Sequence, residues 1–136
     1  MKKILSVNYS QTAFNIAMLC IRLSFGLLIM VNHGLVKLMH FSEMQVTFYN
    51  FMGLGPRISL GLAIFAELIC SLFVVIGLFT RLSVIPLLIT MMVAYFGVHF
   101  KDALNVGEMA IIYGTAFFVL LLCGPGKISV DGMIGK

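Results

Sequence analysis

The longest apolar run of the chain, residues 12–39, contains a charged side chain in its interior, Arg22. A charge at the centre of a bilayer costs about 2.5–3.5 kcal/mol even on the insertion scale that penalises it least. Successive helical residues are about 100° apart, so Arg22, His33 and Lys37 lie within about 60° of one another, together with Gly26. This polar stripe has to face other helices or a wet cavity. Another span must therefore offer a partner at matching depth.

The composition defines the class of protein. Of the 136 residues, 61% are hydrophobic and 10% are charged, whereas soluble domains carry about 25% charged residues. We therefore expect an all-α integral membrane protein that forms one domain over residues 1–136. The net charge of +4 comes from scattered residues without a basic cluster, which argues against a nucleic-acid partner.

Four apolar segments predict an antiparallel four-helix bundle, with spans at about residues 14–39, 56–79, 82–100 and 106–123. Between the first two spans, apolar residues recur at helical spacing and predict a short amphipathic helix at the membrane interface: Met44, Phe48, Phe51 and Met52.

The charged residues outside the spans predict the orientation. One side carries Lys2, Lys3, Arg81, Lys127 and Lys136, and the other carries Lys37, Arg57 and Lys101. The positive excess places both termini in the cytoplasm and the chain in the cell's inner membrane. No cleavage site follows the first apolar run, so we expect an uncleaved first span.

The second span supplies a carboxylate. Ser59, Ala63, Glu67 and Ser71 recur every four residues on one face. With the predicted bounds, the depths of Arg22 and Glu67 differ by roughly 6 Å, which an arginine side chain can cover. We predict an ion pair between them, which either holds the two spans in register or serves a ligand or a proton.

At the opposite end of the spans, His33, Lys37, His99 and Glu108 lie at similar predicted depth. One interpretation is ordinary helix-end polarity, with Glu108 as a cap and Lys37 extending toward the interface. The other is a pocket for a lipophile. Haem ligation by the two histidines is disfavoured by the cations on the same face and by the lack of an attachment motif.

The three cysteines do not indicate a metal site. Cys20, Cys70 and Cys123 form no Cys-x-x-Cys motif, and each lies in or at the end of an apolar run. We interpret them as small buried hydrophobes, and no catalytic residue is assigned.

An ordered set of short motifs resembles the DoxX family of small four-span membrane proteins. The set comprises Arg22 followed by SFG, HGLVKL at 33–38, Glu67, GLFTR at 77–81, Glu108 and GPGKISVDG at 124–132. The resemblance implies the four-span fold. Some relatives are linked to thiosulfate:quinone oxidoreductase, and others to thiol and oxidative-stress complexes or to membrane-protein assembly.

We therefore expect a redox-associated membrane subunit, not an enzyme on its own, that binds a quinone or similar lipophile and works with a soluble or membrane partner. The expected ligand-binding residues are Arg22, His33, Lys37, Glu67, His99 and Glu108. No covalent cofactor is expected, and the oligomeric state is left open. The alternative is a small-solute transporter, channel or assembly factor without redox chemistry. A quinone headgroup needs hydrogen-bond donors at its carbonyls and an apolar slot for its tail, which the second cluster could provide.

Overall fold

The computed structural model describes residues 4–101 and 104–135, and within them the chain forms helices and turns without a β-strand. The predicted all-α class is confirmed. The helices are α1 (Gln11–Ile29), η1 (Met30–Leu35), α2 (Val36–Met39), α3 (Phe41–Met44), η2 (Phe51–Gly53), α4 (Pro56–Ile64), η3 (Phe65–Cys70), α5 (Ser71–Ile76), α6 (Thr80–Met92), η4 (Val93–Val98), α7 (Leu104–Cys123) and α8 (Val130–Ile134).

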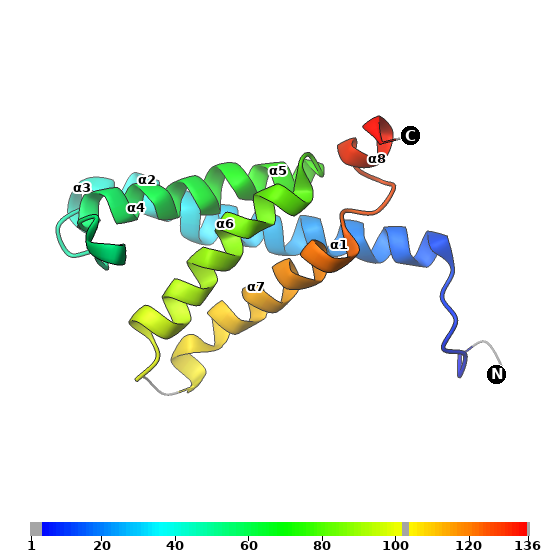
Figure 1. The fold of residues 1–136 in the computed structure, drawn as a ribbon, viewed down its shortest axis with the longest axis horizontal. Helices are drawn as coiled ribbons and strands as arrows, with labels where there is room; N and C mark the ends of the chain where they lie inside the picture. The colour runs from blue at the N-terminus through cyan, green and yellow to red at the C-terminus, as the bar shows by residue number, and fades with distance from the viewer. Residues whose placement is uncertain (1–3, 102–103, 136) are drawn as a thin grey trace.

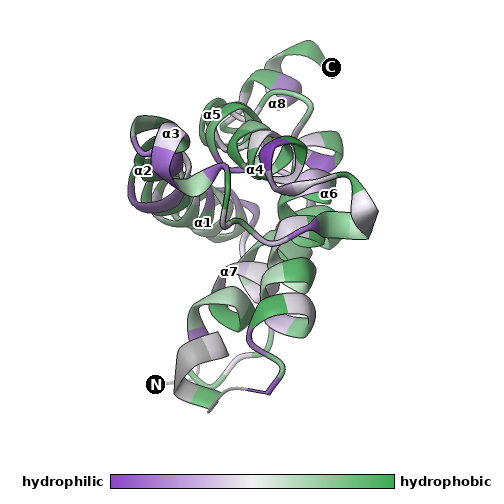
Figure 2. Cartoon of the chain, turned by 90° about the vertical axis from the view of Figure 1, so that its left-hand side faces the viewer, coloured by the Kyte–Doolittle hydropathy of each residue, from purple (hydrophilic) through white to green (hydrophobic). Residues whose placement is uncertain are grey.

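Several of these helices join into longer apolar rods. Gln11–Met39, Pro56–Ile76 and Thr80–Val98 are each long and apolar enough to cross a membrane, and Gly107–Cys123 is a shorter apolar helix in the described chain. Apolar residues lie along all of the long helices, while hydrophilic residues gather near α2 and α3 (Figure 2). The protein is therefore an all-helical membrane protein, and crossing by the fourth helix remains a prediction.

The long helices form two antiparallel pairs (Figure 1). The first rod, α1 to α2, packs along α4 to α5, and α6 packs along α7. The two pairs meet near the turn from α5 to α6 and diverge toward their other ends.

Each of the three longest rods contains a π-helical segment, namely η1, η3 and η4. A π-turn inserts one extra residue into a helix, which rotates the side chains that follow, and such segments are frequent at functional sites. All three segments lie in the diverging half of the molecule and contribute to the cavity described below.

The connection between the first two rods differs from the prediction. In place of one amphipathic helix, the structure has the four-residue α3 and the three-residue η2. The chain reverses through residues with positive φ, Met52 at 50°, Gly53 at 77° and Gly55 at 93°, which a continuous helix cannot contain. The position of this connection at the membrane interface stays a prediction.

Arg22 is buried at the end where the two helix pairs meet, and its hydrogen bonds within the described residues are all to backbone carbonyls. Its Nε donates to the Val74 carbonyl at 2.9 Å and its Nη2 to that of Val75 at 2.9 Å. Its Nη1 donates to the carbonyls of Pro125 at 3.0 Å and Ile128 at 2.6 Å. Arg22 therefore binds the end of α5 to the C-terminal segment.

The predicted ion pair between Arg22 and Glu67 is wrong, because the helix register separates the two residues. Gly34 is the residue of the first rod that packs against Glu67, and it lies twelve positions beyond Arg22, about 18 Å along a helix. Arg22 lies eleven positions after the start of α1 but contacts Val74 and Val75 near the end of α5, so the first rod extends past the second and depths counted from the two ends do not match.

The C-terminal segment, residues 124–135, packs on the end of the bundle where the two helix pairs meet. Asp131 accepts hydrogen bonds from the backbone N–H groups of Phe79 and Thr80, each at 2.8 Å, and so caps the start of α6. The Asp131 N–H donates to the Gly77 carbonyl, and the Lys127 N–H donates to Asn15 Oδ1 at 2.9 Å. The C-terminal segment is thereby bonded to α1 at Asn15 and to the turn between α5 and α6.

Candidate functional site

A cavity of about 670 Å³ lies between the two helix pairs, in the half where they diverge. Its wall is mainly apolar and is built by both pairs and by the connection between the first two rods. The residues that line it are His33, Lys37, Phe48, Tyr49, Phe51, Ser59, Leu62, Ala63, Phe65, Ala66, Glu67, Pro86, Ile89, Thr90, Met91, Val93, Ala94, Val98, His99, Met109, Ala110 and Tyr113.

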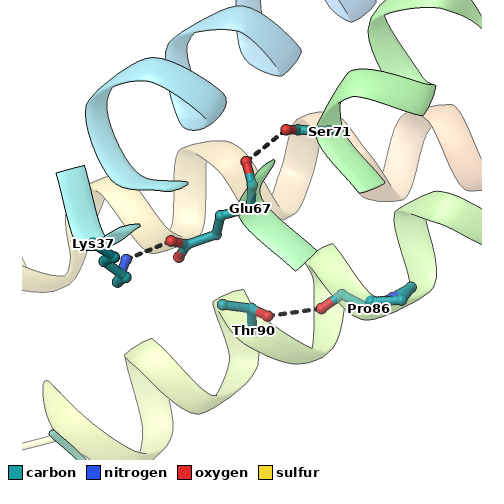
Figure 3. A network of polar contacts seen from close by, with 5 residues as sticks. All are labelled: Lys37, Glu67, Ser71, Pro86 and Thr90. Carbon is teal, nitrogen blue, oxygen red and sulfur yellow. Dashed lines mark hydrogen bonds and ion pairs between the residues drawn. The ribbon is translucent and has the colours of Figure 1, made fainter. Parts of the chain in front are cut away.

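The charged feature of the wall is an ion pair between Lys37 and Glu67 (Figure 3). Lys37 Nζ lies 2.5 Å from Glu67 Oε2, and the two side chains are 16% and 4% exposed. A pair this well shielded interacts strongly, because little water screens it. Lys37 thus takes the place that the sequence had assigned to Arg22.

A glycine contact between the first two rods positions this pair. A Cβ on Gly34 would lie 2.7 Å from both the carbonyl carbon and the carbonyl oxygen of Glu67. The absence of a side chain lets η1 and η3 touch through their backbones, and Lys37 then reaches across to the carboxylate. The HGLVK motif and Glu67 are therefore two halves of one contact.

An aromatic group lies beside the ion pair. The ring of His33 packs edge-on against Tyr113 of α7, with ring centroids 5.6 Å apart and planes at 82°. Phe25 meets Tyr113 in the same way, at 5.9 Å and 86°. These contacts join the first rod to α7 beside the cavity.

Three serine and threonine hydroxyl groups near the cavity donate to backbone carbonyls four residues earlier in the chain. Thr90 Oγ1 donates to the Pro86 carbonyl at 2.8 Å and Ser71 Oγ to the Glu67 carbonyl at 2.5 Å (Figure 3). Ser59 Oγ donates to the Gly55 carbonyl at 2.7 Å. Their donor hydrogens are used within the helices, so they leave the ion pair as the main polar feature facing the space.

The connection between the first two rods covers the outer end of the cavity. Phe48, Tyr49 and Phe51 line it from this connection. A Cβ on Gly97 would lie 2.9 Å from the Tyr49 ring, so this tyrosine rests directly on η4. The N–H of Phe51 donates to Ser59 Oγ at 2.9 Å, which fixes the connection to α4.

Four of the six residues singled out from the sequence line this cavity: His33, Lys37, Glu67 and His99. Arg22 lies outside the lining, near the middle of the first rod, and Glu108 is exposed and also outside the lining. Tyr113 was not among the residues predicted from the sequence, although it is the one tyrosine of the fourth apolar segment. That isolation in an otherwise apolar span was the available signal.

Groups of three or more histidine, cysteine, aspartate or glutamate side chains arranged to hold a metal ion are absent from the described part of the chain. Cys20 and Cys123 are exposed and Cys70 is buried, and all three are free thiols. The expectation of buried cysteines is thus met at Cys70 and wrong at the other two, which face outward from apolar helices.

Comparison with known proteins gives the family. The DoxX family profile matches residues 17–100. Two relatives come from Haemophilus influenzae, and both are described as uncharacterized proteins. One is 31% identical over 101 residues, covering 71% of this chain and 67% of the relative. The other is 31% identical over 77 residues, covering 52% of this chain and 58% of the relative.

No significant match to a solved structure is found. The profile match spans more than half of the chain and includes the Arg22, HGLVKL, Glu67 and GLFTR motifs. The chain therefore belongs to the DoxX family.

Proposed function

We propose that this protein is a four-span subunit of a quinone-linked redox system in the inner membrane, and that it binds a quinone or similar lipophile between its two helix pairs. The observation that supports this most is the cavity itself: a largely apolar space of about 670 Å³ with one buried ion pair in its wall. Ligand sites in proteins are typically apolar spaces of about 300–1,000 Å³ with a few placed polar groups.

The polar groups suit a quinone headgroup. The ammonium group of Lys37 has three N–H bonds, and one is directed at Glu67. Another can donate to a quinone carbonyl. The Glu67 carboxylate can then take up a proton and relay it to the reduced oxygen, and His33 lies in the same wall.

The six residues expected from the sequence enter this proposal differently. Lys37, Glu67 and His33 would contact the headgroup, and His99 lines the cavity at its outer part. Arg22 has no part in it, since its guanidinium is engaged by four backbone carbonyls. Glu108 has none either, because it lies outside the lining.

Reduction of a quinone to a quinol needs two electrons and two protons. We place the source of the electrons in a soluble or membrane partner, as the link of DoxX relatives to thiosulfate:quinone oxidoreductase suggests. The cytoplasmic position of both termini is supported by the charge distribution and by the start of α1 and the end of α7, which lie at the same end of the molecule (Figure 1).

The chain contains no tryptophan, so a single introduced indole can report on quinone binding. Phe48→Trp places the indole in the cavity wall, and Phe118→Trp places it on the exposed outer face of α7. Each variant is reconstituted in lipid nanodiscs and titrated with a decyl-substituted benzoquinone, which quenches indole fluorescence on contact.

We expect saturable quenching at position 48 on top of the linear quenching by quinone dissolved in the lipid, and only the linear part at position 118. Lys37→Met should weaken the saturable part at least tenfold. Equal, non-saturable quenching at both positions would overturn the proposal and favour a transporter or an assembly factor.

A further inference from the structure

We propose that the ligand enters the cavity sideways from the bilayer, between α4–η3 and α6, and that its polar head is neutral and accepts hydrogen bonds from Lys37. This inference rests on the proposed function, because it assumes that the cavity takes up a lipophile. It adds the route of entry and the class of headgroup.

Contacts between the helices restrict access to the cavity from three sides. Aromatic packing of His33 and Phe25 on Tyr113 closes the side toward α7 at the level of Tyr113, while Met109, one turn away on α7, lines the cavity and is 49% exposed. The buried residues Val74, Leu87 and Phe117 belong to the core where the helix pairs meet. The outer end is covered by the connection that carries Tyr49, which rests on Gly97.

The fourth side is the one between α4–η3 and α6. Leu62 and Phe65 on one edge, and Ile89 on the other, line the cavity and are at the same time 47%, 50% and 43% exposed. The same side chains thus form the cavity wall and the outer surface of membrane-spanning helices. α6 packs on α5 and η3 but diverges from α4 (Figure 1), and the cavity reaches the outer surface between these exposed side chains, within segments long and apolar enough to cross a membrane.

We call the opening flanked by Leu62, Phe65 and Ile89 the lateral portal. Its edges are purely aliphatic or aromatic, so a hydrocarbon tail can remain in it without burying an unpaired polar group. A ligand whose head touches Lys37 would extend its tail between these residues into the lipid. Entry through the portal keeps the tail in an apolar medium throughout.

The charges in the cavity wall favour a ligand whose headgroup is neutral. Lys37 and Glu67 neutralise each other, so an anionic head would add an uncompensated charge or compete with Glu67 for the lysine. Either change is costly in an apolar surrounding. A neutral head with an acceptor oxygen can instead take a free N–H of Lys37 and leave the pair intact.

The route of entry is tested by closing two openings in turn. In a chain whose three cysteines are replaced by alanine and which carries Phe48→Trp, one protein receives Leu62→Cys with Ile89→Cys and another receives Tyr49→Cys with Gly97→Cys. Each is reconstituted and mixed with the decyl-benzoquinone before and after bridging by a bifunctional thiol reagent. The protein before bridging is its own control.

We expect the bridge across the lateral portal to slow quenching at least tenfold, and the bridge at the outer end to change it less than twofold. The reverse pattern would overturn lateral entry and indicate access from the aqueous side. Absence of saturable quenching before any bridging would instead count against the proposed function, so the two failures can be told apart.

The class of headgroup is tested by competition. Decanol and decanoate have equal tails and differ in head charge, and neither quenches indole fluorescence. At a pH at which decanoate is ionised, decanol should displace the quinone at least tenfold more effectively than decanoate. Equal or stronger displacement by decanoate would overturn the assignment of a neutral head.

Discussion

Gly34 packs directly against the peptide carbonyl of Glu67, where a Cβ would lie 2.7 Å from both the carbon and the oxygen. This contact sets the register of the first two rods, and the register brings Lys37 to the carboxylate. The geometry of the candidate site therefore depends on a residue without a side chain.

Gly34→Ala should lower the free energy of unfolding by about 1–3 kcal/mol, the usual cost of overpacking a tight contact. The added methyl group forces η1 away from η3, and it should also lower the quinone affinity by separating Lys37 from Glu67. Unfolding by SDS titration in mixed micelles measures the stability. Gly61→Ala is the matched control: no atom lies near its Cβ, so it should be neutral or slightly stabilising. Equal losses in the two variants would refute the role of Gly34.

The ion pair gives a double-mutant prediction. Lys37→Met and Glu67→Met should each destabilise the protein by about 3–5 kcal/mol, because each leaves one buried charge without its partner. The double variant should lose less than either single variant, since it removes both charges. The same SDS titration serves as the measurement. Arg57→Met, at an exposed position on α4, controls for the loss of a cation. Additive losses would show that the two side chains are not coupled.

Arg22→Lys should destabilise the protein although the charge is kept. Lysine cannot span four carbonyls that the guanidinium contacts from three nitrogens, and each lost hydrogen bond to a charged group contributes about 1.5–3 kcal/mol. We expect a loss of about 3 kcal/mol or more, measured by thermal unfolding in detergent. Arg81→Lys is the control, because Arg81 is exposed and makes one bond of 3.2 Å to the Leu122 carbonyl. If both variants melt like the wild type, Arg22 does not hold the tail.

Asp131→Ala should loosen the C-terminal segment and the start of α6. It removes the carboxylate that accepts from the N–H groups of Phe79 and Thr80, and losing a helix cap costs about 0.5–2 kcal/mol. Hydrogen exchange should increase at those two amides. Lys127→Ala, whose side chain is exposed while its backbone N–H keeps its bond to Asn15, should leave both amides as protected as in the wild type. Unchanged exchange in Asp131→Ala would contradict the capping role.

The helical class, the family and most of the cavity's ionisable residues could be predicted from the sequence, because hydropathy and motif order are local properties. The π-helical segments could not. Their backbone hydrogen bonds span five residues where those of an α-helix span four, and the mostly apolar composition of η3 and η4 gives no signal for that change. The residues of the lateral portal could not be predicted either, because the sequence of an apolar span does not distinguish a leucine that faces lipid from one that lines a cavity.

The sequence by itself determined that apolar helices would have to bury Arg22, Lys37 and Glu67, because lipid cannot solvate them. Which of them would meet was decided by the tertiary structure. Close packing at Gly34 fixed the register so that Lys37 faces Glu67, and the C-terminal segment folded back to present carbonyls to Arg22. The requirement for a partner is a property of one helix in lipid, whereas the choice of partner depends on how two helix surfaces fit.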